Sequence, residues 1–257
     1  MIVCLAGIFF LSPSEGSPRS DRNAIVVVDP LNKREIAGSI GMALAWGSQM
    51  HPPRQYARGL KHLTNALHSW TRINVNVTDH ILLSSSDLHN LPFVYVATDE
   101  AFELTGTEMA NVRKYLTGGG FMVLDNSYPP TEFSPAQASI RQMIRDVLGS
   151  HSRFVPIPNS HEMYHCFFDF TEGPPRGSEC EMEHEPVYYL EGVWYKDRLV
   201  AVICNKNYIR NWALTADNQP QLKMGVNMVI FALTQKGGLT RQIERMESRS
   251  EALLLHL

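Results

Sequence analysis

Acidic and amide residues close two apolar segments of the sequence. Phe121–Leu124 leads directly into Asp125 and Asn126, and Phe93–Ala97 is followed, after one threonine, by Asp99. Carboxylates gathered at strand ends can bind a cation, accept hydrogen bonds from a sugar, or act as an acid and a base. The alternative is structural, because Asp and Asn after a strand also cap the backbone amides that follow. We predict that these three residues converge in a binding site.

A polar and aromatic segment follows a third apolar run. Leu199–Cys204 precedes Asn205, and Trp212 comes seven residues later. A tryptophan with Asn and Arg neighbours can stack on a sugar ring or a planar ligand. Equally, Trp212 can cover the hydrophobic core. We include Asn205 and Trp212 in the predicted site.

The segment from His161 to His165 reads H-E-x-x-H. On a helix the two histidines would share a face and could bind Zn²⁺ with Glu162 as general base, and Glu185 could be a third ligand. Prolines at 156 and 158 leave little room for such a helix. We therefore predict no metal and no cofactor, and expect a pair of loop histidines with His161 near the ligand. A site formed by His161, His165 and Glu185 is the alternative.

The four cysteines show no C-x-x-C spacing. Cys166 and Cys180 could form a disulfide in an exported protein, whereas buried thiols are the simpler expectation. No cysteine stands at a glycine-flanked turn between a strand and a helix, so catalysis by a cysteine nucleophile is not expected.

Alternating strand and helix patterns predict an α/β fold. We expect a three-layer α/β/α sandwich with a mostly parallel central sheet, plus a C-terminal β-hairpin region, in one domain spanning residues 23–235. Residues 236–257 should form a C-terminal tail with a helix over Thr240–Leu255. Helices are predicted at Gln55–Trp70, Thr107–Leu116, Ala136–Leu148 and Leu222–Leu233. Strands are predicted at Ala24–Asp29, Gly41–Trp46, Ile73–Leu83, Phe93–Ala97, Phe121–Leu124, Val187–Leu190, Val193–Tyr195 and Leu199–Cys204, with turns at Glu191-Gly192 and Lys196-Asp197.

Residues 1–22 are expected to be separate from this domain. The first eleven residues are apolar and a polar linker follows, with Ser14-Glu15-Gly16 similar to a signal-peptide cleavage site. We predict export to the periplasm or beyond, with a cytoplasmic protein as the alternative. The run is too short to span a membrane, and no other segment is long and apolar enough. A net charge of −3 without basic clusters argues against binding to nucleic acid.

An ordered set of motifs resembles one bacterial family. It comprises the PFVYV strand after Asp87-Leu88, the helix–GGGF–strand run ending at Asp125, the H-x-x-x-H-C-F-F segment, the GVWYKDRLV hairpin and the helix LKMGVNMVIFAL. The chain resembles the domain of unknown function family DUF4159, over most of Met42–Leu233. The resemblance implies a variant of the class I glutamine amidotransferase-like, flavodoxin-like sandwich.

The resemblance also bears on site and partners. Relatives often carry an acidic pair where this chain has Asp125-Asn126, which argues against chemistry that needs two carboxylates there. A glycine before the tryptophan in relatives is replaced by Asn211. Many relatives are exported, or form the extracytoplasmic part of membrane proteins encoded near MoxR-type ATPases and von Willebrand A-like proteins.

These observations predict a non-catalytic, extracytoplasmic module that binds a small ligand or an envelope protein at the carboxyl ends of its strands. The expected binding residues are Asp99, Asp125, Asn126, His161, Asn205 and Trp212. The alternative is a hydrolase, either a zinc peptidase using the H-E-x-x-H segment or a glycan hydrolase using carboxylate and histidine.

Overall fold

The computed structural model describes residues 25–29, 32, 34–51, 55–127, 133–178 and 187–244. Residues 1–22, Cys180 and Glu185, about which the sequence made predictions, are not among the described residues. The described strands are β1 (Ile25–Val28), β2 (Ile36–Trp46), β3 (Arg72–Leu82), β4 (Phe93–Thr98), β5 (Phe121–Asn126), β6 (Ser152–Pro156), β7 (Glu191–Tyr195), β8 (Arg198–Cys204) and β9 (Arg241–Glu244). The helices are α1 (Gln55–Trp70), α2 (Gly106–Thr117), α3 (Pro135–Leu148), α4 (Tyr208–Trp212) and α5 (Gln219–Thr234).

All described strands belong to one mixed sheet. Its order is β6-β7-β8-β5-β4-β2-β1-β9, and β3 pairs with the other side of β2. The strands β3, β2, β4, β5 and β8 run parallel to one another, whereas the pairs β1–β2, β6–β7 and β7–β8 are antiparallel. The predicted α/β class is therefore confirmed, with a mixed sheet where a mostly parallel one was predicted.

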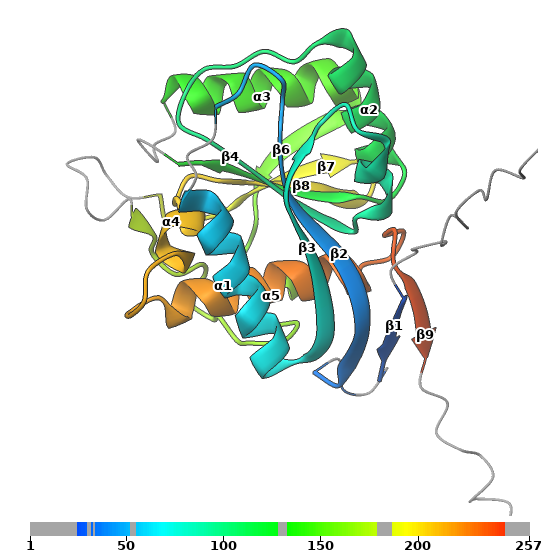
Figure 1. Ribbon diagram of the computed structural model, residues 1–257, viewed down its shortest axis with the longest axis vertical. Coiled ribbons are helices and arrows are strands. Elements are labelled where there is room, and N and C mark those ends of the chain that lie inside the picture. Colours follow the sequence, from blue (N-terminus) through cyan, green and yellow to red (C-terminus); the bar gives the residue numbers. More distant parts are fainter. Residues whose placement is uncertain are drawn as a thin grey trace, which may run out of the picture.

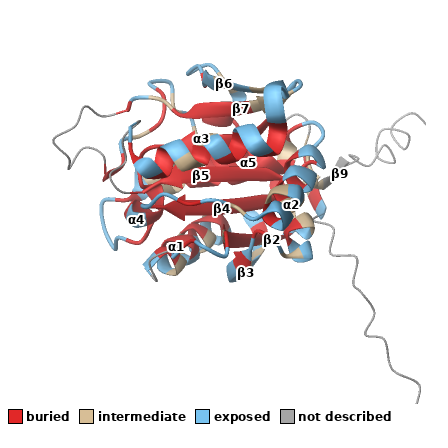
Figure 2. Cartoon of the chain, turned by 90° about the horizontal axis from the view of Figure 1, so that it is seen from above, coloured by how far each residue is buried: buried red, intermediate tan, exposed pale blue. Residues whose placement is uncertain are grey.

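Helices cover both faces of the sheet (Figure 1). The helices α1, α4 and α5 lie on one face, where residues such as Leu60, Trp212 and Val229 join a core with Tyr95 and Val123. The helices α2 and α3 lie on the other face. Figure 2 shows that the central strands are buried along their length, whereas the surface-facing sides of the helices are exposed.

The helix bounds follow from local sequence signals. In α2, Thr105 caps the amino end, since its side chain accepts a hydrogen bond from Glu108 N while the Glu108 carboxylate accepts from Thr105 N. The helix ends before three glycines, of which Gly119 has a φ of +113°. Ser134 caps α3 in the same way, at Gln137 N.

Three predictions about the C-terminal third are wrong. Residues 241–244, assigned to a tail helix, form β9, which pairs in parallel with residues 25–28 of β1. Pairing with another strand overrides the helical pattern of the segment. Val187–Leu190 is not a strand, and Glu191-Gly192 is not a turn, because both residues pair with β8 as the start of β7. The turn at Lys196-Asp197 is confirmed, with Lys196 at a φ of +54°.

Candidate functional site

Three parallel strands end together at one edge of the sheet. In the register, Ala97 of β4 lies beside Asp125 of β5, which in turn lies beside Cys204 of β8. Asp99 and Asn205 directly follow β4 and β8. The strand ends thus bring Asp99, Asp125, Asn126 and Asn205 to one edge, as predicted for open α/β sheets. We call this side of the sheet the carboxyl edge.

Asp125 is completely buried and is held by donors from two elements. The Tyr95 hydroxyl donates to Oδ2 at 2.5 Å, the Asn207 amide donates to Oδ1 at 3.0 Å, and the Ile209 amide reaches Oδ2 at 3.5 Å. Asn207 has a left-handed backbone with φ +52°, a conformation that asparagine adopts more readily than most residues. The carboxylate therefore fastens the chain after β8 to the centre of the sheet.

Burial raises the pKa of Asp125 from its ordinary 3.8 to about 6. Hydrogen bonds from Tyr95, Ile209, Asn207 and Cys204 oppose this rise, because they stabilise the charged form. Desolvation is thus the larger effect at this carboxyl group.

A second set of hydrogen bonds lies beside Asp125. The hydroxyls of Tyr56 and Ser127 are 2.5 Å apart, and Asn126 Nδ2 donates to Asn205 Oδ1 at 3.3 Å. Asn126, Ser127 and Asn205 are each at most 3% exposed. Of the predicted residues, Asn126 and Asn205 therefore bond to each other inside the protein.

Three charged side chains affect the pKa of Tyr56. Burial raises the pKa of Tyr56 above its usual range, the Ser127 hydrogen bond opposes the rise, and the charges of Asp99 and Asp125 add to it. The Arg210 guanidinium has the opposite effect. Both Asp99 and Arg210 are exposed. They form the charged outer layer over a buried polar network.

Trp212 is a core residue. Its ring is fully buried with its centroid 5.0 Å from that of Tyr95, and Nε1 donates to Gln221 O at 2.8 Å. Trp212 therefore covers the hydrophobic core, which was the alternative to ligand stacking.

His161 lies away from the carboxyl edge. Its ring packs against Trp194 and Phe231, with centroid distances of 5.8 and 5.3 Å. Phe231 in turn packs against Phe121, the first residue of β5, and Asp125 lies four residues further, or roughly 13 Å along the strand. The structure does not bring His161 together with the other predicted residues.

The H-E-x-x-H segment is not the helix that a zinc peptidase needs. Glu162–Tyr164 is a single 3₁₀ turn, and His161 precedes it with an extended backbone, with Nδ1 accepting from Met163 N. His165 Nε2 lies 2.8 Å from Asn159 O. In the described part of the chain, no group of three His, Cys, Asp or Glu side chains could hold a metal ion. The helix that the zinc alternative requires is therefore not formed here, because a turn this short cannot place residues i and i+4 on one face.

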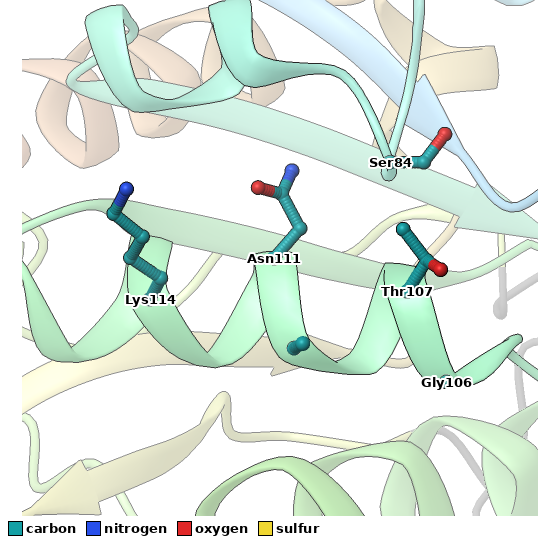
Figure 3. Close-up of a pocket in the computed structure, with 6 residues that line it drawn as sticks. Ser84, Gly106, Thr107, Asn111 and Lys114 are labelled. Atoms are coloured by element: carbon teal, nitrogen blue, oxygen red, sulfur yellow. The ribbon is translucent and has the colours of Figure 1, made fainter.

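A separate depression lies beside α2, on the face of the sheet that α2 and α3 cover. It has a volume of about 490 Å³ and is lined by Ser84, Gly106, Thr107, Ala110, Asn111 and Lys114. In Figure 3 the side chains of Thr107, Asn111 and Lys114 lie along one side of α2 and Ser84 lies across from them. Asn111 Nδ2 donates to Leu83 O and Ser85 O at 2.7 and 2.8 Å. The amide therefore holds the loop after β3, and the depression is not connected with the predicted site.

Comparison with known protein families assigns most of the chain to one family. A family model described as Domain of unknown function (DUF4159) matches residues 48–233. The chain belongs to this family. The match begins just after β2 and ends in α5, so β1 and β9 lie outside it.

No curated protein matches the sequence significantly. Among solved structures, the chain is similar to a protein described as ThuA-like from Bacteroides uniformis, with 9% identity, 77% of this chain and 94% of that chain covered, and a TM-score of 0.40. A similarity at this TM-score assigns neither a function nor a fold family to the DUF4159 chain.

The arrangement limits the chemistry available to this DUF4159 member. Asp125 is within the core and both its oxygens accept internal hydrogen bonds, so it is poorly placed as a base or nucleophile. Cys204 is likewise fully buried. The exposed charged groups at the carboxyl edge include Asp99 and Arg210, which can recognise a charged or polar surface.

Sequence reasoning missed Tyr56, Tyr95, Ser127 and Asn207. Tyr56 and Tyr95 lie in an apolar helix stripe and an apolar strand, patterns that give no sign of where a hydroxyl points. Asn207 has one signal, because Asn-Lys-Asn after a strand favours a left-handed turn.

No described helix is of a length and apolarity that would let it cross a membrane.

Proposed function

We propose that this chain is a non-catalytic module that binds a protein partner through its carboxyl edge. The observation that carries the proposal is a group of large apolar side chains exposed there. Phe133, Tyr188 and Leu214 are 93, 69 and 44% exposed. Exposed apolar groups that gather on one side of a protein indicate an interaction site.

Each of these residues belongs to a segment that leaves or enters the carboxyl edge. Phe133 lies between the end of β5 and the start of α3, and Leu214 lies two residues beyond α4. Tyr188 precedes β7, whose first residue pairs with Ile203 at the end of β8. The three side chains therefore belong to segments that adjoin the carboxyl edge.

The chemistry of this surface suits a protein better than a small molecule. Tyr, Phe and Arg are the residues that contribute most to protein interfaces, and the Arg176 guanidinium lies 5.7 Å from the Tyr188 ring centroid. Asp99 and Arg210 add charges of both signs, which supports recognition of a specific partner. We infer that Asp125, Asn126, Asn205 and Trp212 support this surface from within, and that Asp99 contacts the partner.

We also propose an extracytoplasmic location and a variant of the class I glutamine amidotransferase-like, three-layer sandwich. The apolar residues 1–11 support export. The parallel strands β3, β2, β4, β5 and β8 with helices on both faces support the fold relation. By the family resemblance, envelope systems with MoxR-type ATPases and von Willebrand A-like proteins are the first source of partners to test.

Site-specific photo-crosslinking tests the proposed surface. A benzophenone amino acid replaces Phe133, Tyr188 or Leu214 in the full chain, expressed in its own organism. Ile25, 43% exposed and on β1, provides a control of similar exposure. We expect one common adduct from the three carboxyl-edge positions and none from the control. Equal labelling at all four positions, or no adduct, contradicts the proposal.

A further inference from the structure

The strand β3 is a long edge of the sheet that is open for pairing. Its 11 residues pair with β2 on one side, and no other described strand pairs with its outer side. Figure 2 places β3 at one end of the stack of strands and β6 at the other. We propose that two copies of this chain form a two-fold dimer by antiparallel pairing of their β3 strands, centred on Val75. This proposal does not rest on the proposed function, since it uses a different side of the sheet.

The first seven residues of β3, 72–78, carry few of the features that protect an edge strand. Edge strands usually avoid pairing by being short or by carrying Pro, charged residues such as Lys, or a β-bulge. Residues 72–78 contain no Pro, Gly or Lys, and their one charged residue, Arg72, lies at the end. The other two described edges are shorter, since β6 has five residues and ends in Pro156 and β9 has four. Among the described edges, only β3 offers an uninterrupted segment of this length.

A β-bulge limits the part of β3 that can pair regularly. Ala43 lies beside Thr78 and Ala45 beside Ile81, so Asp79 and His80 together oppose one residue of β2. The seven residues before the bulge, 72–78, have an unbroken register with β2. They form the pairing segment that we propose.

The two faces of this segment differ. Ile73, Val75 and Val77 pack against the core that α1 covers. Asn74 and Asn76 are exposed on the opposite face. Val75 and Val77 are only partly buried, so their remaining apolar surface can be covered by a neighbouring strand.

A second copy matches this pattern position by position. Directly opposed residues of an antiparallel pair lie on the same face. With Val75 at the two-fold axis, Ile73 opposes Val77 of the second copy and Val75 opposes its counterpart, which continues the apolar row. On the other face, Asn74 opposes Asn76, and the two side-chain amides can hydrogen-bond. The order Ile-Asn-Val-Asn-Val is thus palindromic in chemical type.

This self-matching favours a second copy over an unrelated strand. A two-fold axis uses the same patch on both subunits, so the patch must be complementary to itself. Each opposed pair in the register meets this requirement without a buried charge. The polar residues at the ends, Arg72 and Thr78, oppose each other and remain at the surface.

Light scattering on the full chain after gel filtration tests the dimer. We expect twice the 29.0 kDa chain mass at about 100 μM, decreasing toward 29.0 kDa on dilution. Asn74→Lys with Asn76→Lys places like charges opposite each other twice, so this variant should be monomeric. Asn74→Lys with Asn76→Glu places opposite charges there and should restore the dimer.

The two variants differ only at position 76 and both act at exposed positions, so at a concentration where the native chain is monomeric their thermal unfolding should match that of the native chain. A native chain that is monomeric at about 100 μM overturns the proposal. A dimer that persists in the double-lysine variant excludes β3 as the interface. If the lysine–glutamate variant remains monomeric, the register centred on Val75 is wrong, because a register centred on Asn76 would oppose two glutamates.

Discussion

The Tyr95 hydroxyl donates a hydrogen bond of 2.5 Å to Oδ2 of Asp125, and both side chains are completely buried. The bond joins neighbouring strands β4 and β5 at their carboxyl ends. Through the amides of Asn207 and Ile209, the same carboxylate fixes the start of α4. Asp125 is therefore an anchor for the surface that surrounds it.

The raised pKa of Asp125 predicts that its contribution to stability depends on pH. Between pH 3.8 and about 6 the native state binds a proton that the unfolded state has released. The contribution of this group is thus fully present at low pH and is lost as the pH rises through 6, by about 3 kcal/mol in total. Urea unfolding of the native chain and of Asp125→Asn, from pH 4 to 7, measures the difference. The native chain should lose stability relative to the variant as the pH rises; a constant difference would contradict the raised pKa. Asp99→Asn, at an exposed position, is the control.

Removing the hydroxyl of Tyr95 should destabilise the protein more at pH 7 than at pH 4.5. Tyr95→Phe leaves the ionised carboxylate without its shortest donor at pH 7, at a cost of about 1–3 kcal/mol. At pH 4.5 the carboxyl is protonated and the loss is smaller. Tyr115→Phe is the matched control, because this buried hydroxyl donates to the Phe121 carbonyl at 2.9 Å, which does not titrate. Denaturant unfolding at both pH values should show pH dependence for Tyr95→Phe alone.

Gly59 allows α1 to approach the start of α4. A Cβ at this position would lie 2.2 Å from the carbonyl oxygen of Ile209, a backbone atom that cannot turn away. Gly59→Ala should therefore destabilise by about 1–3 kcal/mol, although alanine favours a helix. In Gly106→Ala the added Cβ meets nothing within 4 Å, so its free energy of unfolding should be unchanged or higher. Equal effects of the two substitutions would show that the contact is unimportant.

Zinc should not stabilise this chain. His161 Nδ1 accepts from Met163 N, and the two histidines do not lie on one helix. The unfolding temperature should be the same with Zn²⁺ and with a chelator. His161→Ala should lower the unfolding temperature in both conditions, because its ring packs against Trp194 and Phe231. Zinc-dependent stabilisation that is lost in both His161→Ala and His165→Ala would restore the metal-site alternative.

Much of the fold could be predicted from periodicity and end signals. The helix α1 has the predicted bounds, and β4, β5 and β8 differ by at most two residues at each end. Apolar spacing records which face of an element is buried. It does not record strand partners that are distant in sequence, and so β9, which pairs with β1, was missed.

The sequence predicted that Asp99, Asp125 and Asn205 lie close together, but not that Asp125 and Asn205 are buried. Strand order alone placed Asp99, Asp125 and Asn205 at one edge. Whether a polar side chain points outward or inward depends on what covers it, and here α4 places Trp212 against Tyr95 and amide donors against Asp125. The exposed Phe133 and Tyr188 gave no sequence signal, since exposure depends on packing that is not local.

The most direct test of the carboxyl edge as a binding surface is the affinity of the crosslinked partner for Tyr188→Ala. Isothermal titration with the purified partner compares this variant with the native chain and with Ile25→Ala, which lies on β1. We predict at least a tenfold weaker Kd for Tyr188→Ala, equal to about 1.4 kcal/mol, with an unchanged unfolding temperature and no effect of Ile25→Ala on the Kd. Equal affinities for all three proteins would contradict the account.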